Sequence, residues 1–464
     1  MTDRLAPMDV SFLYLEEPTT PMHVGGVAVF RPPVGEPFDY DKLVSIIEAR
    51  ISLVPRYRQK IKWVPGHLAS PVWVDDNTFD VGFHIRRSAL PKPGGDDQLR
   101  ELVGRLMSRR LDRTRPLWEM YFVEGLSDGR LAVITKSHHA MVDGISSVDI
   151  SQVLLDVTPE PREVPADDWE PDPEPSPIEL VVEAISDFIR QPTEVIDAIR
   201  SGVNDAAATG LKLATQVSGL VAYVRTAARP ASGTPLNVDI GEQRRFGMAR
   251  TELDDYKRVR KMHGGTVNDV VLATVSGALR NWLMTRGEPV NGSTVIRAMV
   301  PVSVRAPAEQ GALGNKVSSY LVDLPVGEED AVERLRQISA KMKTHKEAGQ
   351  SVGADALVRL SGFAPPTLHS MGARAASGLS KRLFNVVVTN VPGPQFPLYA
   401  GGAPMIEVFP VVPLAKNQAV SIGLTSYNGG VYYGLNADRD AMTDLDALCQ
   451  LIEESLAELV ETVS

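Results

Sequence analysis

The period of the hydrophobic pattern changes several times along the chain. Apolar runs at 24–30 and 131–137 have the length and composition of short β-strands. In 39–54 and 97–111, apolar residues recur every three or four positions, which predicts amphipathic helices. We therefore expect residues 1–155 to form a mixed α/β lobe, because strands and helices alternate along it.

The pattern stops at residues 156–177, where seven prolines accompany a strong excess of acidic residues. Proline at this density prevents helices and sheet ladders, so we predict an exposed linker. Apolar spacing of three and four residues returns in 178–191 and in the alanine-rich run 193–229, which predicts one or two further helices. Residues 156–235 thus form a linker with helices.

A second set of strands and helices fills residues 236–464. We predict a helix at 268–287 and strands at 293–304, 317–324 and 385–391. Residues 418–437 contain two further strands, and the Asn-Gly-Gly sequence between them is a hairpin signal. The predicted order is one α/β lobe, a linker with helices, and a second α/β lobe.

Composition and charge agree with this layout. A chain of 464 residues with 43% apolar and 23% charged residues is typical of a globular protein of two or three domains. The net charge of −10 argues against nucleic-acid binding as a main function. The sequence shows no secretion signal and no apolar run of about 18 to 20 residues that could span a membrane. The single cysteine, Cys449, is expected to be a buried apolar residue in a cytoplasmic protein.

The main candidate for a catalytic motif is His138-His139-Ala-Met-Val-Asp143-Gly144, which directly follows the strand predicted at 131–137. A neutral imidazole at a strand end can take a proton from a hydroxyl near neutral pH. Asp143 either fixes an imidazole tautomer or pairs with an arginine to hold the turn, and Gly144 suits close packing or a positive φ. The motif could also bind a metal, but no second His or Cys cluster supplies further ligands.

Other catalytic signatures are absent. The sequence contains no G-x-S-x-G nucleophile motif and no G-x-G-x-x-G after a strand, and residues 311–318 have the wrong glycine-to-lysine spacing for a phosphate-binding loop. A histidine base acting directly on a bound acceptor, without a covalent intermediate, therefore suits this chain best.

The motif also resembles a known family signature. HHAMVDG matches the HHxxxDG motif of the chloramphenicol-acetyltransferase-like, CoA-dependent acyltransferases. The chain as a whole resembles the bacterial wax ester synthase/diacylglycerol acyltransferases, including the mycobacterial triacylglycerol synthases. The supporting stretches are MDVSFLYLE and PMHVGGVAVF near the start, RPLWE at 115–119, TVNDVVLA at 266–273, VPVSVR at 300–305 and TNVPGP at 389–394. Residues 156–235 carry no matching motif.

This resemblance implies a fold and a set of roles. The fold would be two chloramphenicol-acetyltransferase-like lobes, each a mixed sheet packed with helices, joined by a crossover linker. The active histidine would lie in a tunnel between the lobes. By the same resemblance, His139 is the general base, His138 supports it, and Asp143 anchors the loop, paired in our interpretation with Arg305. Gly144 forms the turn.

The implied reaction is the acyl-CoA-dependent esterification of diacylglycerol to triacylglycerol, with wax ester synthesis from fatty alcohols as an additional activity. Acyl-CoA would be a co-substrate, and no cofactor is expected. Long-chain substrates imply peripheral contact with the inner membrane or lipid bodies. The alternatives are a related acyltransferase for another alcohol or amine, and a non-catalytic lipid-binding module.

Several motif residues keep two interpretations each. Trp118 either lines an acyl tunnel or fills the core, which we favour, and Asn268 either contacts substrate or caps a helix. Arginines in 109–115 either bind CoA phosphates or, as we favour, lie at a solvated helix end. The apolar stripes of 178–228 either lie on a lipid surface or, as we slightly favour, pack against the lobes. The candidate substrate-binding residues are Pro116, Leu117, Trp118, Asn268, Asp269, Arg305, Asn390, Pro392 and Gly393.

Overall fold

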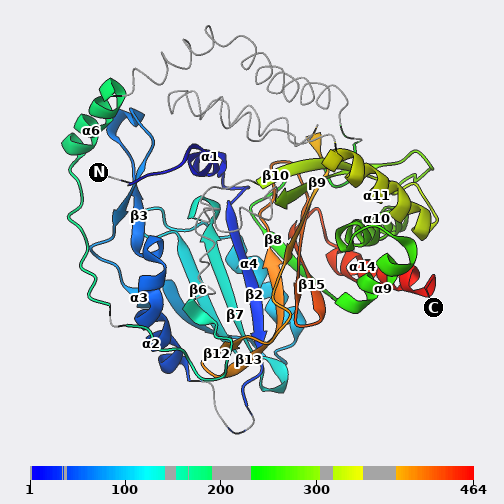
Figure 1. Cartoon of the computed structure of the whole chain (residues 1–464), viewed down its shortest axis with the longest axis horizontal. Coiled ribbons are helices and arrows are strands. Elements are labelled where there is room, and N and C mark those ends of the chain that lie inside the picture. Colours follow the sequence, from blue (N-terminus) through cyan, green and yellow to red (C-terminus); the bar gives the residue numbers. More distant parts are fainter. Residues whose placement is uncertain are drawn as a thin grey trace.

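The computed structural model describes residues 3–33, 35, 39–141, 153–165, 167–190, 231, 233–303, 317–347 and 383–463. These residues form two α/β lobes side by side, each built on a six-stranded mixed sheet (Figure 1). The predicted fold class is confirmed.

The sheet of the first lobe has the strand order β12-β13-β2-β7-β6-β5. The strands are β2 (His23–Phe30), β5 (Ile85–Ala89), β6 (Trp118–Glu124), β7 (Leu131–His138), β12 (Tyr399–Ala400) and β13 (Ala403–Val411). A smaller sheet contains β1 (Asp3–Arg4), β4 (Val72–Asp75) and β3 (Gln59–Lys62). The helices are α1 (Pro7–Leu15), α2 (Tyr40–Arg50), α3 (Val81–His84) and α4 (Asp96–Met107).

Helices α2 and α4 cover opposite faces of this first sheet. Leu131 and Val133 of β7 belong to the same apolar cluster as Leu43 of α2. Ala132 and Ile134 of β7 lie in another cluster with α4. The alternation follows from the two-residue period of a strand, and it buries β7 on both faces.

The first sheet contains strands from the far end of the chain. β12 and β13 come from residues after 236, and β13 pairs antiparallel with β2 from Val411 opposite Gly25 to Met405 opposite Phe30. The predicted boundary at residue 236 therefore does not separate the strands of the two sheets. This crossover places a segment of the second half against the strand that adjoins the histidine motif.

The second lobe has the strand order β10-β9-β11-β14-β15-β8. The strands are β8 (Arg244–Glu252), β9 (Ile296–Ser303), β10 (Val317–Leu324), β11 (Val386–Pro392), β14 (Val420–Tyr427) and β15 (Gly430–Asp438). Helices α9 (Leu253–His263), α10 (Val267–Thr285), α11 (Ala331–Glu347) and α14 (Leu445–Glu461) lie to one side of this sheet (Figure 1). Every strand predicted in 236–464 is present.

Local sequence explains the main features of this lobe. α10 is buried on most of its surface because its residues are mainly apolar, and it packs between α11 and α14. The predicted hairpin turns at Asn428 and Gly429, whose φ angles of 45° and 91° require residues that tolerate the left-handed region. Cys449 is buried as predicted, and burial raises its thiol pKa to about 12.

The linker has no helix or strand between 157 and 176 in its described part, as predicted, but it is held on the first lobe. Arg50 forms a buried ion pair with Asp156 at 3.0 Å. Arg58 pairs with Asp167, and Lys62 donates to the Pro175 carbonyl at 2.6 Å. The acidic residues of the linker thus lie along basic side chains of the lobe.

Helix α6 (Pro177–Arg190) follows the linker and confirms the helix predicted there. Leu180 and Ala184 pack against three valines of the first lobe, namely Val64, Val72 and Val74. The helices predicted in 193–229 lie outside the described residues. Among the described residues, no helix combines the length and apolarity needed to cross a bilayer.

Candidate active site

The histidine pair lies at the end of β7, where the strand passes into a short 3₁₀ turn at His139–Met141. The backbone N–H of His138 donates to the Leu117 carbonyl at 2.9 Å, just before β6. The backbone N–H of His139 donates to the Met22 carbonyl at 2.8 Å, just before β2. The segments on both sides of β7 therefore hold the backbone of the pair in place.

His139 is a partly exposed residue, and its imidazole stacks on Phe12 of α1, with ring centroids 3.8 Å apart and an interplanar angle of 22°. Its Nδ1 is buried and makes no hydrogen bond to another described residue. Burial lowers the pKa of His139 to about 4, and the neighbouring His138 acts in the same direction. His139 is therefore neutral at pH 7, the protonation state that a general base requires.

His138 is fully buried and has a different environment. Its Nδ1 accepts the backbone N–H of Ala140 at 3.0 Å, so the proton of a neutral His138 ring lies on Nε2. That Nε2 faces the Oε2 atom of Glu16 at 3.7 Å. The ring of His138 is thus placed between a backbone donor and a carboxylate.

Glu16, the residue after α1, did not emerge from sequence reasoning. Its side chain is only 2% exposed, accepts a hydrogen bond from Arg113 Nε at 2.9 Å, and lies 3.5 Å from Nε2 of His23. Burial raises its pKa, but interactions with His138, His23 and Arg113 together hold the pKa well below the ordinary value. Glu16 is therefore an ionised, buried carboxylate.

Strand register places His23 beside His138 and Glu16. His23 of β2 pairs with His138 of β7 across the sheet, and burial lowers the His23 pKa to about 4. The one available sequence signal was that both residues lie in the stretches LYLEEP and PMHVGG close to the start. Only the pairing of β2 with β7 brings them to the histidine motif.

The Pro116-Leu117-Trp118 motif is buried beside the histidine pair. Trp118 donates through Nε1 to the Tyr57 carbonyl at 2.8 Å and stacks on His84 with centroids 4.6 Å apart. This geometry agrees with the core role that we favoured for Trp118. Leu117 contributes its carbonyl group to His138, as described above.

Two candidate residues of the second lobe contact each other. Asn390 of β11 donates to the Asn268 side-chain oxygen at 3.3 Å, which joins two motifs far apart in sequence. The capping role considered for Asn268 is wrong, because Thr266 is the N-cap of α10 and its Oγ1 accepts the N–H of Asp269 at 3.2 Å. The Asp269 carboxylate accepts the Thr266 N–H in return at 2.8 Å.

β11 ends at Pro392, and Gly393 directly after it makes a tight backbone contact. The N–H of Gly393 donates to the Ser426 carbonyl at 3.0 Å, and a Cβ atom at position 393 would lie 2.5 Å from that same oxygen. Glycine is therefore required here by space. Asp143, Gly144 and Arg305 lie outside the described residues, so both roles proposed for Asp143 stay predictions.

The arginines of 109–115 divide into two groups. Arg113 is bound to Glu16, and the Arg115 guanidinium lies 4.0 Å from the Phe83 ring centroid. Arg109 and Arg110 are exposed, as expected at a solvated helix end. Within the described ranges, no three His, Cys, Asp or Glu side chains converge as metal ligands would.

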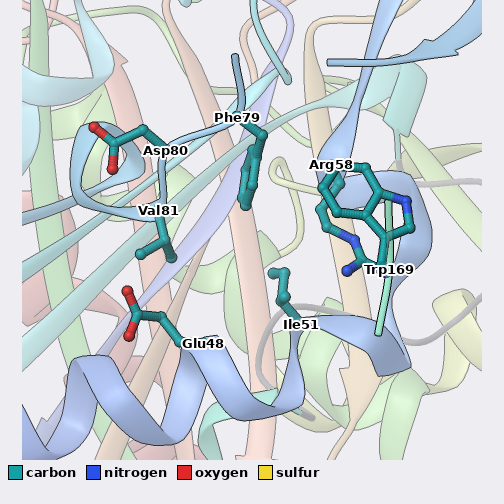
Figure 2. A pocket seen from close by; sticks show the side chains of 7 residues that line it. All are labelled: Glu48, Ile51, Arg58, Phe79, Asp80, Val81 and Trp169. Carbon is teal, nitrogen blue, oxygen red and sulfur yellow. The ribbon is translucent and has the colours of Figure 1, made fainter. Parts of the chain in front are cut away.

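An open pocket of about 500 Å³ lies beside the linker residue Trp169 (Figure 2). The Trp169 ring, contributed by the linker, lies beside Arg58 at one end of the pocket, with the guanidinium carbon 4.2 Å from the ring centroid. None of the predicted site residues lines this pocket. The lining residues are Glu48, Ile51, Arg58, Phe79, Asp80, Val81 and Trp169.

Comparison with known proteins places the chain in a family. The wax ester synthase/diacylglycerol acyltransferase catalytic domain matches residues 5–271, and the WS/DGAT C-terminal domain matches residues 313–460. The chain belongs to this family. It is therefore an acyltransferase, and its histidine motif lies within the catalytic domain.

Individual relatives agree with this assignment. The chain is 35% identical to the probable diacylglycerol O-acyltransferase tgs2 of Mycobacterium tuberculosis, over 99% of both chains. It is 33% identical to tgs1 of the same organism, over 99% of this chain and 96% of that one.

Two solved structures share the fold of this chain. The wax ester synthase/diacylglycerol acyltransferase from Marinobacter aquaeolei VT8 is 29% identical, covers 99% of both chains and has a TM-score of 0.70. The first condensation domain of the CDA synthetase, at 15% identity and a TM-score of 0.56, shares the fold.

Proposed function

We propose that this acyltransferase transfers the acyl group of a long-chain acyl-CoA to the hydroxyl of diacylglycerol, with His139 as the general base. The observation that carries the proposal is the neutral imidazole of His139, a partly exposed residue at the end of β7. The names of the tgs1 and tgs2 relatives support diacylglycerol as the acceptor.

The proposed reaction is a single displacement at the thioester. His139 takes the acceptor's hydroxyl proton, and the oxygen attacks the thioester carbonyl carbon to form a tetrahedral intermediate. The C–S bond then breaks, and the proton on His139 passes to the departing CoA sulfur. Because Nδ1 is buried, we assign both proton transfers to Nε2. The reaction needs no covalent enzyme intermediate and no cofactor besides the co-substrate acyl-CoA.

We propose long-chain alcohols as a second class of acceptor. The Marinobacter relative is named as a wax ester synthase as well, which supports long-chain alcohols as additional acceptors. Two alternatives remain to be distinguished by the acceptor assay. One is transfer to another alcohol or amine, and the other is lipid binding without catalysis.

The substrates imply a place of action. We propose a cytoplasmic protein in peripheral contact with the inner membrane or lipid bodies, where diacylglycerol is available. Three apolar residues on α6 support this contact: Ile178, Val182 and Ile185 are 75%, 59% and 51% exposed and recur at helical spacing. The helix lies at the outer edge of the first lobe (Figure 1).

The assay uses labelled palmitoyl-CoA with diacylglycerol, hexadecanol or no acceptor, followed by separation of the lipid products. The wild-type protein is expected to form triacylglycerol, and His139→Ala should lose about 10²-fold or more in kcat with unchanged folding, since general-base catalysis contributes typically 10²–10⁴-fold. His67→Ala, an exposed histidine on the same lobe, is the matched control.

Substantial turnover by a folded His139→Ala variant would place the base elsewhere. If wild-type protein forms no ester with either acceptor, a panel of other alcohols and amines comes next. Failure with the whole panel, together with saturable binding of acyl-CoA, would support the lipid-binding module.

A further inference from the structure

We infer that Glu16 is the positioning residue of the histidine pair, holding the ring of His138 so that the backbone on either side of His139 is fixed. This inference rests on the proposed role of His139 as the base. It assigns a function to a carboxylate outside the HHxxxDG motif.

The placement of Glu16 depends on α1. The backbone N–H of Glu16 donates to the Phe12 carbonyl at 3.2 Å, which ends the helix. Phe12 itself stacks on the His139 ring. One helical turn therefore carries both supports, an aromatic ring against His139 and a carboxylate against His138.

The chain of contacts runs from Glu16 to His139 in three steps. Glu16 Oε2 lies 3.7 Å from the Nε2 atom of His138, an electrostatic contact longer than a hydrogen bond. The other ring nitrogen accepts the Ala140 N–H, which assigns the proton of the neutral ring to Nε2. Ala140 directly follows His139, whose own N–H is bound to the Met22 carbonyl. The peptide groups on both sides of His139 are thus anchored, one of them through the His138 ring.

The charges around Glu16 argue for more than a structural ion pair. Arg113 alone would neutralise the carboxylate, and it is also tied to α1 through the Leu13 carbonyl at 2.9 Å. Yet Oε1 of Glu16 has no hydrogen-bond partner in the described part of the chain and faces the imidazole of His23. Burying a charge with an incomplete set of partners costs stability, so a role in orienting the His138 imidazole explains the presence of the Glu16 carboxylate better than stability does.

Two further groups act on Glu16. The buried Lys136 lies two residues before His138 on β7, and its charge interacts with that of Glu16. Its Nζ is held by the Leu106 carbonyl at 3.0 Å, at the end of α4. His23 is neutral at pH 7 because burial lowers its pKa. The field at His138 is therefore set by Glu16 together with Arg113 and Lys136.

The first measurement is made on the wild-type protein. Histidine labelled with ¹⁵N, in long-range ¹H–¹⁵N spectra with the His138 signal assigned by comparison with His138→Gln, reports which ring nitrogen carries the proton. We expect the neutral His138 ring to carry its proton on Nε2. A protonated Nδ1 in the neutral ring would overturn the inference, whatever any variant does.

The second measurement uses Glu16→Gln, which keeps the shape and removes the charge, with Glu17→Gln as the matched control. Glu17 is the adjacent carboxylate, and it pairs with Lys416 at 2.9 Å with both side chains 38% exposed. We expect Glu16→Gln to lower kcat about 10- to 100-fold with little change in KM for palmitoyl-CoA, since losing the carboxylate that orients a catalytic histidine directly costs up to about 10⁴. Its His138 spectrum should show mixed tautomers.

A third variant guards against loss of folding. Glu16→Asp retains the charge on a shorter side chain, and it should recover part of the kcat that Glu16→Gln loses. A folded Glu16→Gln with wild-type kcat and an unchanged His138 spectrum would refute the inference. If His139→Ala remains active, the proposed base is wrong, whereas the His138 tautomer still tests the contact of Glu16 by itself.

Discussion

Three titratable residues of the first lobe, His23, His139 and Glu16, have strongly shifted pKa values. His23 and His139 have pKa values of about 4, mainly because burial disfavours the charged form. Glu16, between His23 and His138, is held ionised by their contacts and by Arg113. These shifts make the protonation of the site and the stability of the fold depend on the same side chains.

The sign of that dependence follows from linkage. An unfolded histidine has a pKa near 6.5, so a histidine with a folded pKa of about 4 binds fewer protons when folded. The stability that His23 and His139 contribute is fully present above about pH 6.5 and is lost as the pH falls toward 4. Glu16 adds a further loss of stability as the pH falls below about 4.5, because its carboxylate takes up a proton more readily in the unfolded chain than in the folded one.

We therefore expect the melting temperature to fall between pH 7 and pH 4.5, measured by circular dichroism at fixed ionic strength. His23→Asn should flatten part of this fall, because it removes one buried titratable ring. His67→Asn is the control, since His67 is exposed. A melting temperature independent of pH over this range would contradict the assigned pKa shifts.

Helix α6 has apolar side chains on both its buried and its exposed sides. It buries Leu180 and Ala184 against the first lobe, yet Ile178, Val182 and Ile185 face outward. Both interpretations of its stripes thus apply to this helix, because one stripe packs against the lobe and another is exposed. Its acidic residues Glu179 and Glu183 give anionic lipids no electrostatic advantage.

A triple variant, Ile178→Ser, Val182→Ser and Ile185→Ser, tests the lipid contact. We expect it to reduce co-sedimentation with phosphatidylcholine vesicles containing diacylglycerol about tenfold or more, since each apolar side chain fully buried contributes about 1.5–3 kcal/mol. Activity on substrates dissolved in detergent should be retained.

The matched control for this variant is Met262→Ser on α9, which is 64% exposed but lies on the second lobe. Unchanged sedimentation of the triple variant would show that α6 does not bind the lipid surface.

At the scale of the whole molecule, the two sheets meet where β13 of the first passes β15 of the second. A Cβ atom at Gly434 of β15 would lie 1.9 Å from the Pro410 carbonyl oxygen of β13. The lobes can approach so closely only because position 434 has no side chain. Phe246 of β8 and Phe409 of β13 join α4 in one apolar cluster at the same junction.

Gly434→Ala should consequently destabilise the protein by about 1–3 kcal/mol or more, as overpacking does, because the obstacle is backbone that cannot rotate away. Urea unfolding measures this loss. Gly292→Ala is the control, since a Cβ there meets nothing within 4 Å. Equal stability of the two variants would mean that the junction between the lobes is not tightly packed.

The amino-acid sequence was sufficient for features that depend on neighbouring residues. The strand before His138, the hairpin at Asn428 and Gly429, the proline-rich linker and the helices α2, α4, α6 and α10 all follow from local periodicity and turn chemistry. The HHAMVDG motif likewise identified the histidine pair, because its members are adjacent in sequence and lie at a strand end.

Only tertiary structure decided which distant residues meet. Strand register brings His23 to His138, and the end of α1 brings Glu16 to both. The crossover of β13 and the contact of Asn268 with Asn390 also depend on pairing across more than 100 residues. Hydrophobic periodicity tells which face of a strand is buried but not which strand lies beside it, so these contacts have no local signal.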